Sequence, residues 1–166
     1  MGGVYQLDKL MSEARRLARE YRAAMGKPLP GITGELAVHD CIRLLDLDPV
    51  PAGTGGYDAV GRGERAGRRI QIKGRAIFDE AKGGQRLGQL KATQQWDSMM
   101  LVLMDQHYDP VEIYEAERAD VLAAMDETSR NRTRRGAVSV ARFKIIGRLA
   151  WTREDGAGGE LWDNQT

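Results

Sequence analysis

The sequence predicts a single α/β domain built around a mixed β-sheet. Three observations lead to this prediction: apolar residues at helical spacing near the N-terminus, a hairpin-like pair of short strands in the middle, and an uninterrupted apolar run at residues 99–104. Such a run is typical of a strand buried on both faces of a sheet. A length of 166 residues suits one domain with its own core and is short for two.

Two helices are predicted at the start of the chain. Residues 5–25 place apolar side chains at helical spacing, with Arg and Glu residues between them. Pro28 then ends this first helix. A second helix is predicted over residues 33–45, with Thr33 as its N-cap.

The middle and the end of the chain predict strands with short helices between them. Residues 57–60 and 69–73 are two strand candidates joined by a glycine-containing turn, and a hairpin is the simplest interpretation. After the buried run, residues 111–114 predict a further strand and residues 116–125 a helix. Small closing elements are expected over residues 138–151. The order of helices and strands favours an α/β fold with a mixed sheet.

Composition excludes several classes of protein. The only cysteine is Cys41, so an internal disulfide and a cysteine-rich zinc site are both excluded. No apolar run approaches the length needed to cross a membrane. The first residues lack the basic and apolar blocks of a signal peptide, and we therefore expect a cytoplasmic protein.

Charge is unevenly distributed although the net charge is only +1. Residues 62–75 contain six basic residues and one acid, and residues 130–148 contain seven basic residues and no acid. Between residues 105 and 127 the balance reverses, with eight acids and one arginine. Local basic segments of this kind are what a polyanion would contact.

One strand candidate directs polar side chains to a single face. Ile70 and Ile72 can face the core, and Gln71 and Lys73 then share the other face because side chains alternate along a strand. A paired hairpin strand would bring Asp58 beside them. Carboxylate and amide oxygens are ligands suited to Mg²⁺, and a nearby ammonium can act on a water or a phosphate. The competing interpretation is a half-exposed cross-strand ion pair, which contributes well under about 1 kcal/mol.

The same residues resemble the PD-(D/E)xK nuclease superfamily. Its motif is an acid, a gap of hairpin length and then acid-x-Lys; Asp58 matches the first acid and Lys73 the lysine. Gln71 stands where the second acid is usual, and glutamine there resembles the Mrr-like restriction endonuclease branch. Upstream, residues 31–41 (GITGELAVHDC) are similar to the helix start that precedes the hairpin in those nucleases and in archaeal Holliday-junction resolvases. Glu35 is the matching residue.

The resemblance implies a restriction-endonuclease-like fold, a mixed sheet flanked by helices, and a metal-dependent DNA endonuclease acting in defence or repair. The ion would be Mg²⁺ or Mn²⁺, held by Asp58, Glu35, Gln71 and the Ile72 carbonyl. Lys73 would orient or deprotonate the attacking water. Because an amide neutralises no metal charge, Glu35 matters more here than in an all-carboxylate site. The alternative is that Glu35 is an exposed residue favoured by the helix dipole.

Arginines near this motif and towards the C-terminus fit a DNA partner, since each can neutralise a backbone phosphate. We expect DNA contacts from Arg69, Arg75, Arg86, Arg132, Arg134 and Arg135. The alternative is a solvated hairpin and a mobile loop.

The predicted organisation is one domain, residues 1–166, with appended segments. These are an N-terminal helix (1–28), a nuclease-like core (31–125), basic C-terminal elements (129–151) and a flexible tail (155–166). A nuclease of this size is expected to form a homodimer in order to cut two strands, although the first helix can equally pack on its own domain. The rival function is an inactive nuclease-fold module that binds nucleic acid or a protein. Gln71 favours that rival, whereas Asp58 and Lys73 favour catalysis.

Overall fold

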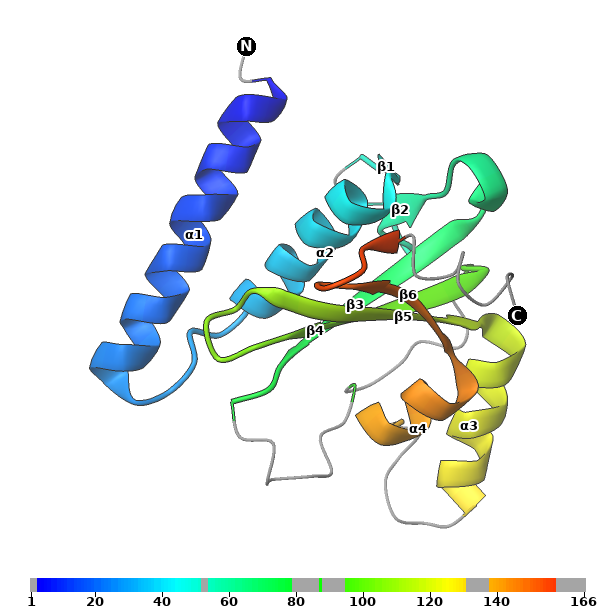
Figure 1. Ribbon diagram of the computed structural model, residues 1–166. Helices are drawn as coiled ribbons and strands as arrows, with labels where there is room; N and C mark the ends of the chain where they lie inside the picture. The colour runs from blue at the N-terminus through cyan, green and yellow to red at the C-terminus, as the bar shows by residue number, and fades with distance from the viewer. Residues whose placement is uncertain (1–2, 52–53, 79–86, 88–94, 131–137, 158–166) are drawn as a thin grey trace.

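The computed structural model describes residues 3–51, 54–78, 87, 95–130 and 138–157. In this part of the chain, six strands form one mixed sheet with helices on both faces (Figure 1). The elements in chain order are α1 (Val4–Met25), α2 (Ile32–Leu45), β1 (Asp48–Pro49), β2 (Ala59–Val60), the short 3₁₀ helix η1 (Gly63–Arg65), β3 (Arg69–Ala76), β4 (Ser98–Met104), β5 (Pro110–Glu117), α3 (Arg118–Arg130), α4 (Val140–Ile146) and β6 (Arg148–Thr152).

The sheet follows the order of the chain, β1-β2-β3-β4-β5-β6. Strands β3 and β4 run parallel, and the other neighbouring pairs run antiparallel. The predicted mixed sheet is therefore confirmed. The predicted hairpin is confirmed as well, with Ala59 of β2 opposite Ile70 of β3.

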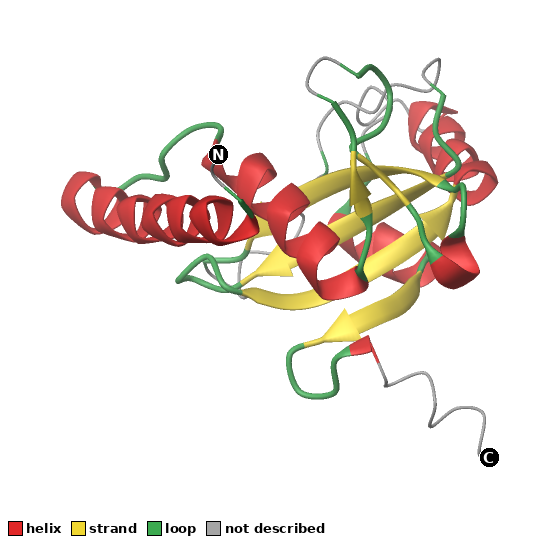
Figure 2. Cartoon of the chain, turned by 90° about the horizontal axis from the view of Figure 1, so that it is seen from above, coloured by secondary structure: helices red, strands yellow, loops and turns green. Residues whose placement is uncertain are grey.

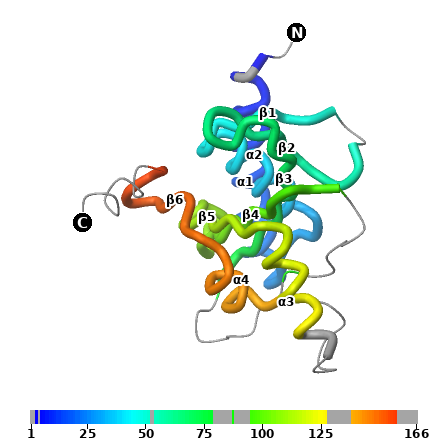
Figure 3. The backbone as a smooth tube through the Cα atoms, turned by 90° about the vertical axis from the view of Figure 1, so that its right-hand side faces the viewer, coloured from blue at the N-terminus to red at the C-terminus, as the bar shows by residue number. Residues whose placement is uncertain are grey.

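Strand β4 lies at the centre of the fold, where every one of its residues is buried. Met100 and Val102 pack with α2 on one face, and Met99 and Leu101 pack with α3 and α4 on the other. Figure 3 shows α2 and the α3–α4 pair on opposite sides of the strands. The prediction of a buried strand at residues 99–104 is confirmed, because a strand covered on both faces needs apolar side chains at every position.

Two local predictions differ from the structure. Thr33 lies inside α2 and is not its N-cap; that position belongs to Gly31, whose φ of 83° is a left-handed conformation that glycine adopts at little cost. The segment between α2 and β2, to which the sequence analysis assigns no element, contains the short edge strand β1, which pairs with β2. Two residues, one of them a proline, carry too little strand pattern to be recognised.

The buried carboxylate of Glu115 links the β2–β3 turn to β6 at one end of the sheet. Glu115 accepts hydrogen bonds from Arg65 Nε at 2.9 Å, Arg148 Nη2 at 3.0 Å and Ser98 Oγ at 2.8 Å. Burial alone would raise the pKa of Glu115, but these partners outweigh it and the pKa is lowered. The resulting stabilisation is complete above the ordinary pKa of a glutamate and is lost as the pH falls through the lowered pKa.

Helix α1 projects along one side of the domain, next to α2 and the β4–β5 turn (Figure 2). Within the described residues, no helix is both long enough and apolar enough to cross a bilayer. Arg86, residues 131–137 with Arg132, Arg134 and Arg135, and residues 158–166 of the predicted tail (155–166) lie outside the described part of the chain.

Candidate active site

Strand β3 separates its side chains between two different environments. Ile70 and Ile72 belong to the core beneath α2. Gly74 faces the same helix so closely that a Cβ built on it would lie 2.5 Å from the Cβ of Ala37. Because side chains alternate, Gln71 and Lys73 project from the opposite face, as the sequence predicted.

Asp58 lies at the edge of β3, immediately before β2 begins. Its backbone N–H donates to the Ile70 carbonyl at 2.8 Å, and its Oδ2 accepts from the Ile72 N–H at 2.8 Å. The β2–β3 ladder covers only two residues of β2, so the carboxylate replaces the next backbone acceptor along this edge. The N–H and C=O of one strand residue point to the same edge, which puts the Ile72 carbonyl on the same side as Asp58.

Gln71 is buried, with 8% of its surface exposed. Its Oε1 accepts no hydrogen bond from any residue that the structure describes. A buried oxygen without a partner is rare in folded proteins and costs roughly 1–3 kcal/mol. A cation or a donor group from a ligand would remove that cost, so the amide oxygen has the properties of a ligand-binding atom.

Lys73 and Arg75 place two positive charges on the face that carries Gln71. Both side chains are partly buried, and Arg75 Nη1 donates to the Gly74 carbonyl at 2.6 Å. Burial lowers the pKa of Arg75, although a guanidinium remains charged at neutral pH. Charges in a partly desolvated position act more strongly on an approaching anion than fully solvated charges do.

Glu35 is not brought to this cluster. It is an exposed residue near the start of α2, a helix that faces the sheet through Leu36, Ala37 and Cys41. On a helix with 3.6 residues per turn, Glu35 falls on the side away from these residues. Gln71, moreover, lies on the sheet face that α2 does not cover. The arrangement fits the alternative given above, an exposed acid near the positive end of the helix dipole.

Arg69 is held by an acid that the sequence pattern did not single out. Asp97 accepts from the Arg69 backbone N–H at 2.8 Å and from its Nε and Nη2 at 3.1 Å each, and the pKa of Asp97 is lowered by these bonds. The guanidinium also donates to Gln95. This ion pair fixes the start of β3 beside β4. It also engages most of the Arg69 guanidinium, the group that was expected to contact DNA. The only indication of this role in the sequence was the position of Asp97, an acid just before the buried run at residues 99–104.

The described residues contain no group of three or more His, Cys, Asp and Glu side chains that suits a metal ion. The candidate site instead offers one carboxylate, one amide oxygen and one backbone carbonyl, from Asp58, Gln71 and Ile72. Mg²⁺ accepts such oxygen ligands and commonly keeps several waters, so the unpartnered Gln71 oxygen and the Asp58 carboxylate fit a weakly held ion.

Comparisons with known proteins supply no functional assignment for this chain. A scan against protein-family models finds no match, and a search of curated proteins finds no significant relative. The geometry of Asp58, Gln71 and Lys73 therefore carries the argument that follows.

Proposed function

We propose that this chain is a metal-dependent DNA endonuclease of the PD-(D/E)xK type, with a restriction-endonuclease-like arrangement of its sheet. One observation supports the proposal above all others. The buried Gln71 oxygen has no partner among the described residues, and it lies next to the residue whose N–H holds the Asp58 carboxylate. The two side-chain oxygen ligands, from Asp58 and Gln71, and the Lys73 ammonium thus come from neighbouring positions on β3 and at its edge.

Each residue has a distinct part in the proposed reaction. Asp58, Gln71 and the Ile72 carbonyl hold the ion, Mg²⁺ or Mn²⁺, which when bound polarises the phosphate and lowers the pKa of a water. Lys73 orients or deprotonates the attacking water and stabilises charge developing on the phosphate. Glu35 is left out of this set, because its side chain lies on the outer side of α2.

The DNA partner is proposed from the positive charge on the same face. Arg75, two residues after Lys73 on β3, is proposed to bind a backbone phosphate. Arg69 shares its guanidinium between this role and Asp97. Arg86 and the arginines of residues 131–137 are proposed to extend the phosphate contacts. A cytoplasmic location and a role in defence or repair belong to the same proposal.

A second candidate function is an inactive nuclease-fold module that binds nucleic acid or a protein. The position of Glu35 favours it, since the proposed metal site then has a single carboxylate. Purified protein incubated with plasmid and with linear DNA in Mg²⁺, Mn²⁺ or EDTA separates the two functions. Metal-dependent cleavage supports the nuclease, whereas DNA binding without cleavage in either metal supports the module.

Replacing Gln71 with glutamate is expected to tighten Mg²⁺ binding about tenfold, roughly 1.4 kcal/mol, because a charged ligand replaces a neutral one. Without metal, the new carboxylate is a buried charge in place of a neutral amide, so the variant should melt at a lower temperature in EDTA than the natural protein. Calorimetric titration and thermal melts measure the two effects. Gln106→Glu adds the same charge at an exposed turn and should change neither. Unaltered Mg²⁺ affinity in Gln71→Glu would place Gln71 outside the metal site.

Joint replacement of Arg132, Arg134 and Arg135 with alanine is expected to weaken DNA binding about equally for all sequences. It should flatten the slope of log K against log salt by up to about 0.9 per lost phosphate contact, while single-turnover cleavage at saturating DNA survives. The control removes three exposed cations that lie outside both basic segments, Lys27, Arg43 and Arg153. If both triple variants keep the original slope, the tract makes no phosphate contacts.

A further inference from the structure

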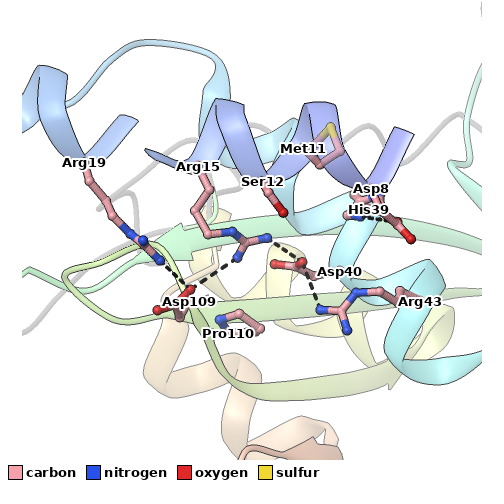
Figure 4. Close-up of a pocket in the computed structure, with 10 residues that line it drawn as sticks. All are labelled: Asp8, Met11, Ser12, Arg15, Arg19, His39, Asp40, Arg43, Asp109 and Pro110. Atoms are coloured by element: carbon pink, nitrogen blue, oxygen red, sulfur yellow. Dashed lines mark hydrogen bonds and ion pairs between the residues drawn. The ribbon is translucent and has the colours of Figure 1, made fainter. Parts of the chain in front are cut away.

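A cavity of about 450 Å³ lies between α1, α2 and the β4–β5 turn. Its volume falls within the range of roughly 300–1,000 Å³ that is usual for small-molecule sites. Its lining carries three arginines, three aspartates and one histidine (Figure 4). Because α2 covers the sheet face opposite to Gln71 and Lys73, this cavity is separate from the candidate active site.

Most of the charged groups in this cavity are paired with one another across the two helices and the turn. The three closest pairs, at 2.6, 2.8 and 3.2 Å, are Arg15–Asp40, Arg19–Asp109 and His39–Asp8. A charge that is already matched at such a distance has little to gain from a ligand. Any binding capacity therefore depends on the atoms that these pairs leave over.

Asp40 and Arg43, one turn apart on α2, are the groups left with capacity for a ligand. Asp40 is fully buried, and its Oδ2 has no hydrogen-bond partner among the described residues. The Arg43 side chain is 51% exposed, and its Nη2 lies 3.6 Å from Asp40 Oδ1, too far for a hydrogen bond. Figure 4 shows the Asp40 carboxylate between the guanidinium groups of Arg15 and Arg43. Asp40 thus lacks a donor at one oxygen, and Arg43 lacks a close acceptor.

We propose that this cavity binds a small zwitterion of the amino-acid class. The ligand's ammonium donates to the Asp40 carboxylate, and its carboxylate accepts from the Arg43 guanidinium. Asp40 becomes accessible when the Arg43 side chain moves outward, and this movement gives up only a loose ion pair because Arg43 is half exposed. Met11 and Pro110 line the same cavity and provide apolar surface for the ligand's side chain.

The charges of the lining favour a zwitterion over ligands with a single charge. A phosphate or another simple anion would pair with Arg43 but draw it away from Asp40, whose buried carboxylate would lose one of its two arginines. An amine without an acid group would pair with Asp40 but place a second positive charge beside Arg43. With three arginines and three aspartates, the lining has no excess charge that would attract either kind of ion. A ligand with one charge of each sign satisfies Asp40 and Arg43 together.

Thermal melts of the whole protein with each of the standard L-amino acids, at millimolar concentration and without DNA or metal, test the proposal independently of the nuclease activity. At least one amino acid should raise the melting temperature, because a ligand that binds only the folded state stabilises it. Calorimetric titration should then show that the N-acetyl form and the methyl ester of that amino acid each bind at least about tenfold more weakly. No rise with any amino acid overturns the proposal, and so does equal binding of either blocked form.

Two variants locate the binding in this cavity. Arg43→Ala should keep the circular dichroism of the natural protein, because the side chain is half exposed, and should weaken amino-acid binding at least about tenfold. The matched control Arg142→Ala removes an arginine of similar exposure from α4, on the other face of the sheet, and should bind as the natural protein does. Asp40→Asn keeps an oxygen for Arg15 but removes the charge that holds the ammonium, so it should also lose binding. Natural affinity in Arg43→Ala would overturn the proposed site.

Discussion

Replacing Lys73 with alanine is expected to abolish detectable DNA cleavage and to leave the fold and most of the DNA affinity intact. A positioned acid–base group or charge donor contributes about 10²–10⁴-fold to the rate of such reactions. The strand itself is held by Ile70 and Ile72 in the core beneath α2, and neither contact involves the lysine side chain. Single-turnover cleavage of a plasmid in Mg²⁺ measures the loss, and circular dichroism checks the fold.

A matched replacement separates chemistry from charge for this prediction. Lys27→Ala removes one lysine from an exposed position in the loop after α1, so the net charge changes equally. We expect Lys27→Ala to cut at the natural rate. Equal turnover of Lys73→Ala and the natural protein would exclude the assignment of Lys73 to the reaction.

Asparagine in place of Asp58 should eliminate cleavage and Mg²⁺ binding but preserve stability. The amide oxygen of asparagine can still accept the Ile72 N–H, so the edge of β3 keeps its hydrogen bond while the cluster loses its only carboxylate. Alanine at this position removes both functions. The Ile72 N–H is then left without its acceptor, at a cost of roughly 1–3 kcal/mol. For a chain of this size, the melting temperature should fall by about 2–4 °C for each kcal/mol.

The comparison of the two Asp58 variants decides between a catalytic and a structural aspartate. If Asp58 only closes the strand edge, Asp58→Asn will cut DNA normally and Asp58→Ala alone will be impaired. If it holds metal, both variants are inactive and only alanine lowers the melting temperature. Calorimetric titration of Mg²⁺ into Asp58→Asn provides a measurement that does not depend on cleavage.

The parts of the fold that the sequence predicted are those dictated by strand periodicity. The run at residues 99–104 has no polar position, and only a strand buried on both faces requires that. The separation of Ile70 and Ile72 from Gln71 and Lys73 follows from alternation alone. The contact between Asp58 and β3 follows from the hairpin, whose turn length limits where that aspartate can lie.

The features that were not predicted depend on how elements are oriented in three dimensions. The direction of Glu35 is set by the rotation of α2 on the sheet, which Leu36, Ala37 and Cys41 determine together. A motif match places a residue on a helix but says nothing of this rotation. The burial of Gln71 likewise depends on what covers its face of the sheet, and the strand pattern left open whether that face was covered.

The close approach at Gly74 has an evolutionary consequence. Any larger residue there would bring its Cβ to 2.5 Å from Ala37 Cβ and to 3.0 Å from the Thr33 carbonyl oxygen, and would lift α2 away from the sheet. Descendants of a common ancestor that keep this helix–sheet contact should therefore keep a glycine directly after the lysine position. That glycine would persist in lineages that had lost Asp58 or Lys73, and so would mark shared ancestry where the chemistry no longer does.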